Sequence, residues 1–452
     1  MNTARLRSLV LYIILAGFVG GMLFFLVCFF FQGGSWAMRA SNQHLQGENQ
    51  LSNAGTITDR NGVIVAQSID GERVYNDDYT TRRAMLHVLG DTNGYISTGV
   101  QTVYLSKLTG FNPILGVTQA ENGGGNIQLT VDSSLSALAL KELAGRNGAV
   151  AMYNYKTGEV LCFVSTPDFD PADVPDDIST NEAYDGAFLN KALSSSFTPG
   201  STFKIVTSAC ALENIPDINS RTFTCKGKKV INGNTITCDH ETAHGKQTLQ
   251  DALTNSCNVA FADLAVELGS AKLKATAEKM GFNKSFSVDD NRTAASSYQV
   301  NGSTSEDELA WSGIGQFTDT ANPVHMMLLM GAIANGGTPV LPHTIASAGP
   351  LSGLSGEAGK TGAQLLESST ANQLKEMMRN NVINGYGDDL FPGMEVCAKS
   401  GTAEVAGQED TGWFVGFSQN SATPYAFAIV VEEGGYGLSS AGYIASALMQ
   451  AA

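Results

Sequence analysis

The chain has 452 residues, of which 43% are hydrophobic and 15% are charged, so most of it is expected to fold into one to three domains. Its formal net charge is −16. A surface that binds nucleic acid needs clustered lysine and arginine, so this balance argues against nucleic acid as a partner. The excess of acid is most simply explained by solubility.

The N-terminus has the pattern of a membrane anchor. Arg5 and Arg7 precede an uninterrupted apolar run from Leu9 to Phe31, which exceeds the ~20 residues that span a bilayer. The apolar core of a cleaved signal peptide is shorter, about 7–15 residues, and a small-residue cleavage site follows it. We therefore predict a cytoplasmic tail at 1–8, an uncleaved transmembrane helix at 9–31, and the rest of the chain outside the cytoplasm.

A small module is predicted at 37–120. Apolar residues alternate around Asn61-Gly62 in the segment 55–66, which is typical of a β-hairpin. Mixed helix and turn signals follow over 72–115. The glycine-rich segment 121–126 is then predicted to link this module to a second domain at 121–452.

The second domain mixes strands and helices. A strand at 127–131 precedes a helix that Asp132 caps and that runs to about Leu143. The middle of the domain, 249–333, is mostly helical in pattern. Five further strands are predicted, followed by a last helix at 440–449: 149–155, 159–165, 396–399, 412–417 and 425–432. Strands at both ends and helices between them predict an α/β domain whose sheet is closed by distant segments.

A serine-lysine pair begins a buried helix in this domain. Ser201 and Lys204 follow the turn Pro199-Gly200, and the apolar residues after them have helical spacing. Residues three apart lie on one helix face, so the lysine can reach the serine. A lysine desolvated by a pocket can be neutral enough to take the proton of a serine nucleophile. The motif S-x-x-K alone is weak, because a solvated helix turn also produces it.

Cysteine is sparse, and one pair differs from the rest. Cys225 and Cys238 flank a polar hairpin whose turn is Asn232-Gly233, and we expect a disulfide that closes this loop outside the cytoplasm. Free thiols and a small zinc site with His240 and His244 are the alternatives. The remaining cysteines are expected in the membrane span or in the apolar core: Cys28, Cys162, Cys210, Cys257 and Cys397.

Ser256 and Asn258 form the second candidate motif, S-x-N. The same triplet begins at Ser179 and at Ser418, but those copies lie in an early loop and in a hairpin turn. Ser256 lies between two apolar helical segments, where a loop can present a hydroxyl and an amide to a cleft.

The third motif is K-S-G at Lys399. K-T-G triplets at Lys156 and Lys360 compete with it, but only Lys399 ends an apolar strand that two more strands follow. A strand edge can hold an extended peptide and place a cation at its carboxylate, and Gly401 leaves room for close approach.

In this order, S-x-x-K, S-x-N and K-[ST]-G resemble the motifs of the penicillin-recognising serine acyl transferases. The N-terminal anchor, the segment 59–62, and the contexts of Ser201 and Lys399 look like those of class B penicillin-binding proteins. The resemblance covers nearly the whole chain, although the N-terminal module is short. It implies a central five-stranded antiparallel sheet flanked by helices, an all-helical subdomain, and a small α+β N-terminal module.

The resemblance also implies catalytic roles. Ser201 would be the acylated nucleophile and Lys204 its base. Ser256 would pass the proton to the leaving amine, Asn258 would bond the substrate amide, and Lys399 would tune Ser256 electrostatically.

Further roles would fall to the backbone and to the strand that begins with Lys399. Ser400, Gly401 and Thr402 would bind the terminal carboxylate of the donor peptide or of a β-lactam. The backbone N–H groups of Ser201 and Thr402 would form the oxyanion hole. No cofactor and no metal are expected.

The implied function is a membrane-anchored D,D-transpeptidase that crosslinks peptidoglycan stem peptides and is acylated by β-lactams, beside a multi-span membrane glycosyltransferase. A D,D-carboxypeptidase, a β-lactamase or β-lactam sensor, and a catalytically idle scaffold of the cell-wall complex are the alternatives. The N-terminal module favours a synthase, and the intact motifs argue against the scaffold.

Overall fold

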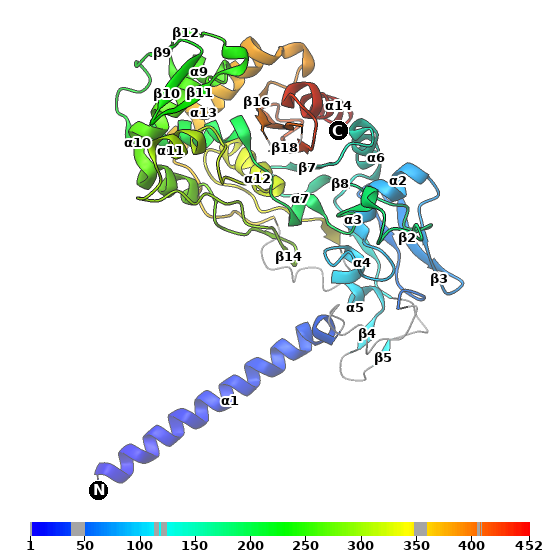
Figure 1. Ribbon diagram of the computed structural model, residues 1–452. Helices are drawn as coiled ribbons and strands as arrows, with labels where there is room; N and C mark the ends of the chain where they lie inside the picture. Colours follow the sequence, from blue (N-terminus) through cyan, green and yellow to red (C-terminus); the bar gives the residue numbers. More distant parts are fainter. Residues whose placement is uncertain are drawn as a thin grey trace.

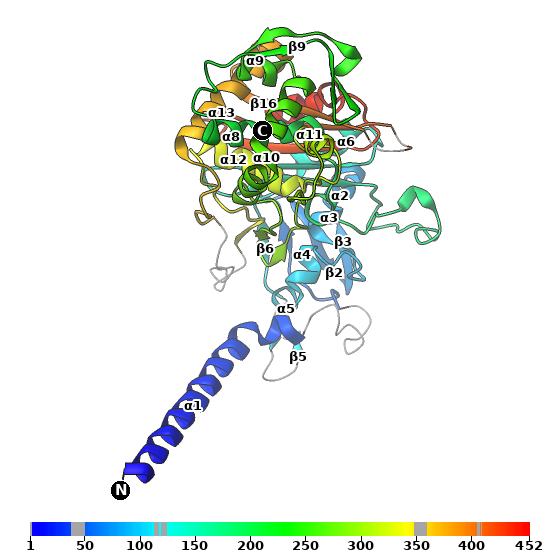
Figure 2. The ribbon, with the colours of Figure 1, turned by 60° about the vertical axis from the view of Figure 1, so that its left-hand side comes forward.

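A computed structural model describes residues 2–37, 50–112, 117–118, 124–347, 359–404, 407 and 409–452. The first part of the predicted linker, 121–123, lies outside these residues. One long helix projects from the rest of the molecule, and the module that follows it lies between this helix and the large domain (Figures 1 and 2).

The projecting helix is α1 (Asn2–Ala37). Its segment Arg5–Phe29 has a mean hydropathy of 2.6, and none of it is buried against the protein. Among the described residues it is the one helix long and apolar enough to span a membrane. An apolar helix with no buried face matches the predicted transmembrane segment.

The N-terminal module is built on a small sheet with strand order β15-β6-β1-β2-β3. As predicted, β1 and β2 form an antiparallel hairpin, with Gly62 at a φ of 82° in the turn. Two of its strands, β6 and β15, come from the large domain. Strand β6 pairs with β1 in parallel, and β15 pairs with β6. The elements are β1 (Ile57–Thr58), β2 (Ile64–Ile69), β3 (Glu72–Tyr75), β6 (Ile127–Leu129), β15 (Ile345–Ser347), α2 (Tyr79–Ala84), α3 (Leu86–Leu89), α4 (Val100–Val103), α5 (Leu105–Leu108), β4 (Phe111–Asn112) and β5 (Val117–Thr118).

The large domain contains the predicted five-stranded sheet. Its order is β16-β17-β18-β7-β8, and every neighbouring pair is antiparallel. The strands are β7 (Gly148–Asn154), β8 (Val160–Thr166), β16 (Val396–Ala403), β17 (Thr411–Ser418) and β18 (Tyr425–Val431). The pairing of β18 with β7 joins the two distant parts of the chain, as their patterns predict.

Both faces of this sheet are covered. Helix α12 (Pro323–Ala334) packs on one face, and α6 (Ser133–Leu143) and α14 (Tyr443–Ala451) pack on the other. Alternate residues of β7 point to opposite faces, so Tyr153 lies in one apolar cluster and Met152 in the other. A strand buried on both faces reads as a continuous apolar run, which is the pattern of β7.

A largely helical subdomain lies beside the sheet (Figure 1). Its helices are α8 (Lys204–Asn214), α9 (Leu249–Thr254), α10 (Asn258–Lys279), α11 (Glu306–Ser312) and α13 (Ser368–Asn381), and the short α7 (Lys191–Ser194) precedes them. The resemblance implied an all-helical subdomain, but the structure adds short antiparallel strand pairs. These are β9 (Phe223–Cys225) with β12 (Gly245–Gln247) and β10 (Lys228–Ile231) with β11 (Asn234–Thr237). A further pair, β13 (Ser287–Val288) with β14 (Asn291–Arg292), lies where the large domain meets the N-terminal module.

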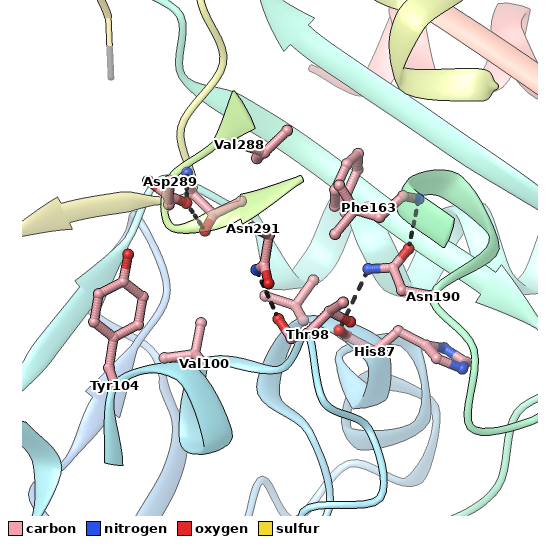
Figure 3. A pocket seen from close by; sticks show the side chains of 12 residues that line it. His87, Thr98, Val100, Tyr104, Phe163, Asn190, Val288, Asp289 and Asn291 are labelled. Atoms are coloured by element: carbon pink, nitrogen blue, oxygen red, sulfur yellow. Dashed lines mark hydrogen bonds between the residues drawn. The ribbon is translucent and has the colours of Figure 1, made fainter. Parts of the chain in front are cut away.

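A small cavity lies where the N-terminal module meets the large domain (Figure 3). Hydrogen bonds cross this interface beside it: Asn291 Nδ2 donates to the carbonyl of Thr98 at 3.0 Å, and Asn190 Nδ2 donates to that of His87 at 3.4 Å. The cavity measures about 20 Å³, room for about one water molecule. These contacts fix how the module sits on the large domain.

Asp59, at the predicted hairpin, joins the two domains. Its buried carboxylate accepts from the backbone N–H groups of Asn61 and Val63, at 2.8 and 2.9 Å. It also accepts from Ser133, at 2.7 Å from the hydroxyl and 3.2 Å from the backbone N–H at the start of α6. One side chain therefore holds both the hairpin turn and the first turn of α6.

We predict that Asp59→Ala lowers the local stability of the hairpin and of the first turn of α6 by about 3 kcal/mol, because buried donors lose a charged acceptor. Hydrogen exchange should show faster exchange of the amides of Asn61, Val63 and Ser133. Asp176→Ala, at an exposed loop position, is the control and should leave these amides unchanged. Equal protection in both variants would contradict the prediction.

Candidate active site

Ser201 lies in a tight turn that opens α8. Residues Gly200–Phe203 form a 3₁₀-helix, and α8 continues from Lys204. The predicted helix is confirmed, although its first turn is tighter than an α-helix. Gly200 has a φ of 53°, a left-handed conformation that favours glycine.

This turn packs closely against β16. A Cβ atom on Gly200 would lie 2.4 Å from the carbonyl oxygen of Thr402, and one on Gly401 would lie 2.8 Å from that of Pro199. The indole N–H of Trp413 donates to the carbonyl of Thr198 at 2.9 Å. The glycines let the two backbones approach, so the Ser201 turn and the K-S-G strand are packed together as one unit.

Lys204 is fully buried at the centre of the candidate site. Its Nζ lies 3.0 Å from Ser201 Oγ and 3.2 Å from Ser256 Oγ. It also lies 2.6 Å from both the carbonyl oxygen of Ser256 and Oδ1 of Asn258. The first two motifs therefore meet at one amine.

The surroundings of this amine favour its neutral form. Burial, and then the charge of Lys399, lower the pKa of Lys204 well below its usual value. A neutral amine has two N–H donors, which the carbonyl of Ser256 and Oδ1 of Asn258 can accept. Its lone pair then remains for the proton of Ser201, so the geometry suits general-base activation of a serine.

Ser256 links the two lysines. Its Oγ lies 3.2 Å from Nζ of Lys204 and 3.1 Å from Nζ of Lys399. The residue has a φ of 49°, which is uncommon for a residue other than glycine. Such strain persists where the surrounding structure imposes it, and here it holds the hydroxyl between two amines.

Asn258 is placed differently from the role that the resemblance implied. Its Oδ1 lies against Lys204, and its Nδ2 donates to the carbonyl of Thr237 at 2.7 Å. Both ends of the amide are thus engaged within the protein. In this structure Asn258 positions Lys204, and a contact with a substrate amide stays a prediction.

Lys399 is also fully buried, and burial lowers its pKa to about 7. Its Nζ donates to the carbonyl of Ser400 at 2.8 Å. Ser400 contacts a residue that the motifs did not reveal: Tyr386 Oη accepts from the backbone N–H of Ser400 at 2.9 Å and lies 3.1 Å from its Oγ. Tyr386 ends the short π-helix Val382–Tyr386 and precedes a glycine, and nothing in its local sequence indicates this contact.

The competing motif copies lie elsewhere. Lys156 is exposed in the turn between β7 and β8, with its Nζ 2.8 Å from Asn335 Oδ1. Lys360 is exposed in a loop before α13. Ser418 ends β17 and donates to the carbonyl of Met394. The sequence argument chose among the copies by their expected local structure. The structure brings together the same three motifs and leaves these rival copies apart.

The predicted disulfide is not formed. Cys225 and Cys238 are free, with their Sγ atoms 3.6 Å apart, whereas a disulfide bond is about 2.05 Å long. Cys257, expected as a plain core residue, has its Sγ 3.7 Å from that of Cys238. The sequence argument missed this third sulfur because it lies inside the S-x-N motif and far from the hairpin.

Comparison with known proteins identifies the family to which this fold belongs. Residues 148–450 match the family described as the penicillin binding protein transpeptidase domain. The chain belongs to this family. The predicted penicillin-recognising transpeptidase, with its serine acyltransferase fold, is therefore confirmed.

Relatives of several kinds share the family. Stage V sporulation protein D of Bacillus subtilis is 30% identical over 305 residues, covering 62% of this chain and 44% of that protein. Peptidoglycan D,D-transpeptidase PbpA of Mycolicibacterium smegmatis is 26% identical over 453 residues, covering 89% of this chain and 88% of that one.

Solved structures agree on the fold. The D,D-transpeptidase domain of a peptidoglycan glycosyltransferase from Eggerthella lenta has a TM-score of 0.75 and 29% identity, covering 88% of this chain and 97% of that one. Penicillin-binding protein A of M. tuberculosis, solved as a ceftriaxone acyl-enzyme, has a TM-score of 0.77 at 23% identity, covering 89% and 99%.

We predict that Lys399→Ala slows acylation by a β-lactam on the order of 10²-fold at neutral pH, because it removes the buried amine that contacts Ser256 Oγ. A general-base role requires Lys204 to be neutral, so the rate is expected to fall as pH falls through the apparent pKa of the lysine pair. The charge of Lys399 lowers the pKa of Lys204. Its removal should therefore raise that pKa and move the acidic limb of the rate profile to higher pH.

Lys156→Ala and Lys360→Ala are the matched controls, since both lysines are exposed and belong to the rival K-T-G copies. Their rates and acidic limbs should equal those of the unaltered protein. Equal losses in the three variants, or an acidic limb that moves to lower pH in Lys399→Ala, would overturn the assignment.

Proposed function

We propose that this protein is a membrane-anchored D,D-transpeptidase that crosslinks peptidoglycan stem peptides through an ester on Ser201. The observation that carries the proposal is the 3.0 Å separation of Ser201 Oγ from a buried Lys204 Nζ. A relative that is named a peptidoglycan D,D-transpeptidase is 26% identical to this chain, and the match covers 88% of that relative. Its name supports peptidoglycan as the substrate class.

The first half-reaction acylates the serine. Lys204 takes the proton of Ser201 as Oγ attacks the carbonyl carbon between the two D-alanines of the donor. The new C–O bond forms and the C–N bond breaks. The proton passes through Ser256 to the leaving amine, and the terminal D-alanine departs. The contacts of Ser256 Oγ with both lysines support this route.

The second half-reaction reverses these roles. An amine of a neighbouring strand attacks the ester carbonyl and gives its proton to Lys204. The new C–N bond forms, the C–O bond to Ser201 breaks, and Lys204 returns the proton to Oγ, so that Ser201 leaves as the alcohol. Ser400, Gly401 and Thr402 on β16 would bind the donor carboxylate, and the backbone N–H groups of Ser201 and Thr402 would stabilise the oxyanion. The close packing of the Ser201 turn on β16 supports this arrangement.

The chain organisation completes the proposal. Residues 1–8 would be cytoplasmic, 9–31 would cross the membrane, 37–120 would form the pedestal, and 121–452 would be the catalytic domain outside the cytoplasm. Arg5 and Arg7 before the apolar run favour this orientation.

A multi-span membrane glycosyltransferase is the proposed partner of α1. Gly17, Gly20 and Gly21 have open space around their backbones, and small residues let transmembrane helices approach closely.

Ser201→Ala should abolish covalent labelling of the full-length protein in detergent by a fluorescent penicillin, because the nucleophilic oxygen is lost. Ser208→Ala is the matched control: this serine lies on the same helix, and its buried Oγ has no hydrogen-bond partner among the described residues. It should label normally. Labelling of Ser201→Ala at the normal rate would refute the assignment of Ser201 as the nucleophile.

A second arm separates transfer from hydrolysis. Intact-mass analysis with a stem-peptide thioester and an amine acceptor should show an acyl-enzyme on Ser201 and then the crosslinked product. Formation of the hydrolysed peptide alone would instead identify a D,D-carboxypeptidase.

Replacing 9–31 by an unrelated span of equal length and orientation tests the partner proposal. We expect the variant to reach the membrane, to label with penicillin, and to complement cell-wall synthesis poorly in a strain that lacks the native protein. Full complementation would show that α1 is only a tether.

A further inference from the structure

Four metal-ligating side chains converge next to the S-x-N motif. Their ligand atoms all lie within 4.8 Å of one another. We call them the Cys-Cys-His-Cys cluster; its members are Cys225, Cys238, His244 and Cys257. They come from the end of β9, the residue after β11, the residue before β12, and the residue before α10. The three thiols are buried and the imidazole is half-buried.

The separations match a tetrahedral zinc site. Cys238 Sγ lies 3.6 Å from Cys225 Sγ and 3.7 Å from Cys257 Sγ, and Cys225 Sγ lies 3.5 Å from Nδ1 of His244. Zinc with Zn–S distances of about 2.3 Å and a Zn–N distance of about 2.0 Å places two sulfurs about 3.8 Å apart, and a sulfur and a nitrogen about 3.5 Å apart. The agreement holds for all three measured edges.

Backbone N–H groups also point at two of the sulfurs. The N–H of Gly227 donates to Cys225 Sγ at 3.3 Å, and that of Ala260 donates to Cys257 Sγ at 3.4 Å. Gly227 has a φ of 89°, and a Cβ there would lie 2.1 Å from the carbonyl of Glu241, so the turn needs glycine. Such outer contacts orient thiolate ligands and stabilise their charge.

We propose that the Cys-Cys-His-Cys cluster binds one zinc ion as a structural site. Three thiolates and one imidazole are soft and borderline ligands that suit zinc, and four protein ligands close the coordination sphere. A disulfide between two of these cysteines would leave the third sulfur and the imidazole converging on it without a role.

The site would stabilise the catalytic loop. Cys257 lies between Ser256 and Asn258, and Cys238 follows Thr237, whose carbonyl accepts from Nδ2 of Asn258. A zinc ion joining these two cysteines would therefore hold both sides of Asn258, and through it the 2.6 Å contact of Oδ1 with Lys204. It would also hold Ser256 in its left-handed conformation. We expect loss of zinc to slow acylation without removing any catalytic group.

Metal analysis of the full-length protein in detergent tests the site directly. The protein should carry one zinc ion per chain, and strong chelators should remove it. Cobalt(II) added to the zinc-free protein should produce sulfur-to-cobalt charge-transfer absorption and the intense visible bands of a tetrahedral site. Fluorescent penicillin should label the zinc-free protein at least about tenfold more slowly, as expected for loss of an outer support, and added zinc should restore the rate.

Variants locate the ligands. Cys225→Ser and His244→Ala should lose the metal, whereas His244→Cys, which supplies a fourth sulfur, should retain it. Cys162→Ser, at a buried free cysteine on β8, is the matched control and should bind zinc normally. Retention of the cobalt spectrum by His244→Cys guards against a variant that fails only because it unfolds.

Three outcomes would overturn the proposal: a chain that binds no zinc when zinc is supplied, ligand variants that bind as much as the unaltered chain, or a Cys225–Cys238 disulfide in peptide mapping without reduction. Unchanged labelling of zinc-free protein would overturn the effect on the catalytic loop. The metal measurements do not depend on the proposed function, since a chain that binds zinc and fails to react with penicillin would refute only that function.

Discussion

The burial of one lysine amine is the constraint on which the candidate active site depends. Lys204 has no access to solvent, so its charged form is disfavoured, and its two closest contacts are a backbone carbonyl and the Oδ1 of Asn258. These oxygens accept the N–H groups of a neutral amine and leave its lone pair to Ser201. An exposed lysine at the same spacing would be protonated and could not act as a base. The apolar helices around the site therefore determine its chemistry.

A second buried lysine makes the site an electrostatic pair. Lys399 lies on β16 and reaches Ser256, so each lysine lies about 3 Å from the same hydroxyl. Because both amines are desolvated and repel each other, the pair resists carrying two protons. In the proposed mechanism Ser256 would then pass a proton between them. Its strained φ fits this view, since strain is retained where a side chain must be held in one position.

Close backbone packing holds the pair together. Glycines on the Ser201 turn and on β16 remove the Cβ atoms that would separate the two elements. The opposite side of the site depends on α10, whose first turn carries Asn258, and on the β9–β12 region that the Cys-Cys-His-Cys cluster would attach to it. One side of the site is thus fixed by apolar packing of the large sheet. The other rests on a small region of two short antiparallel strand pairs, where a metal ion would supply the stability that a small core lacks.

The sequence alone determined the membrane span, the hairpins, the helix capped by Asp132, and the three motifs, because these features depend on local periodicity, capping and turn chemistry. Order along the chain and strand context also selected Lys399 over Lys156 and Lys360. Only the tertiary structure decided what depends on distant segments meeting. It placed Tyr386 in contact with Ser400 of the K-S-G strand, turned Asn258 toward Lys204, and brought Cys257 to Cys225 and Cys238. The local sequence pattern does not predict such contacts, because their geometry arises only when helices and sheets pack.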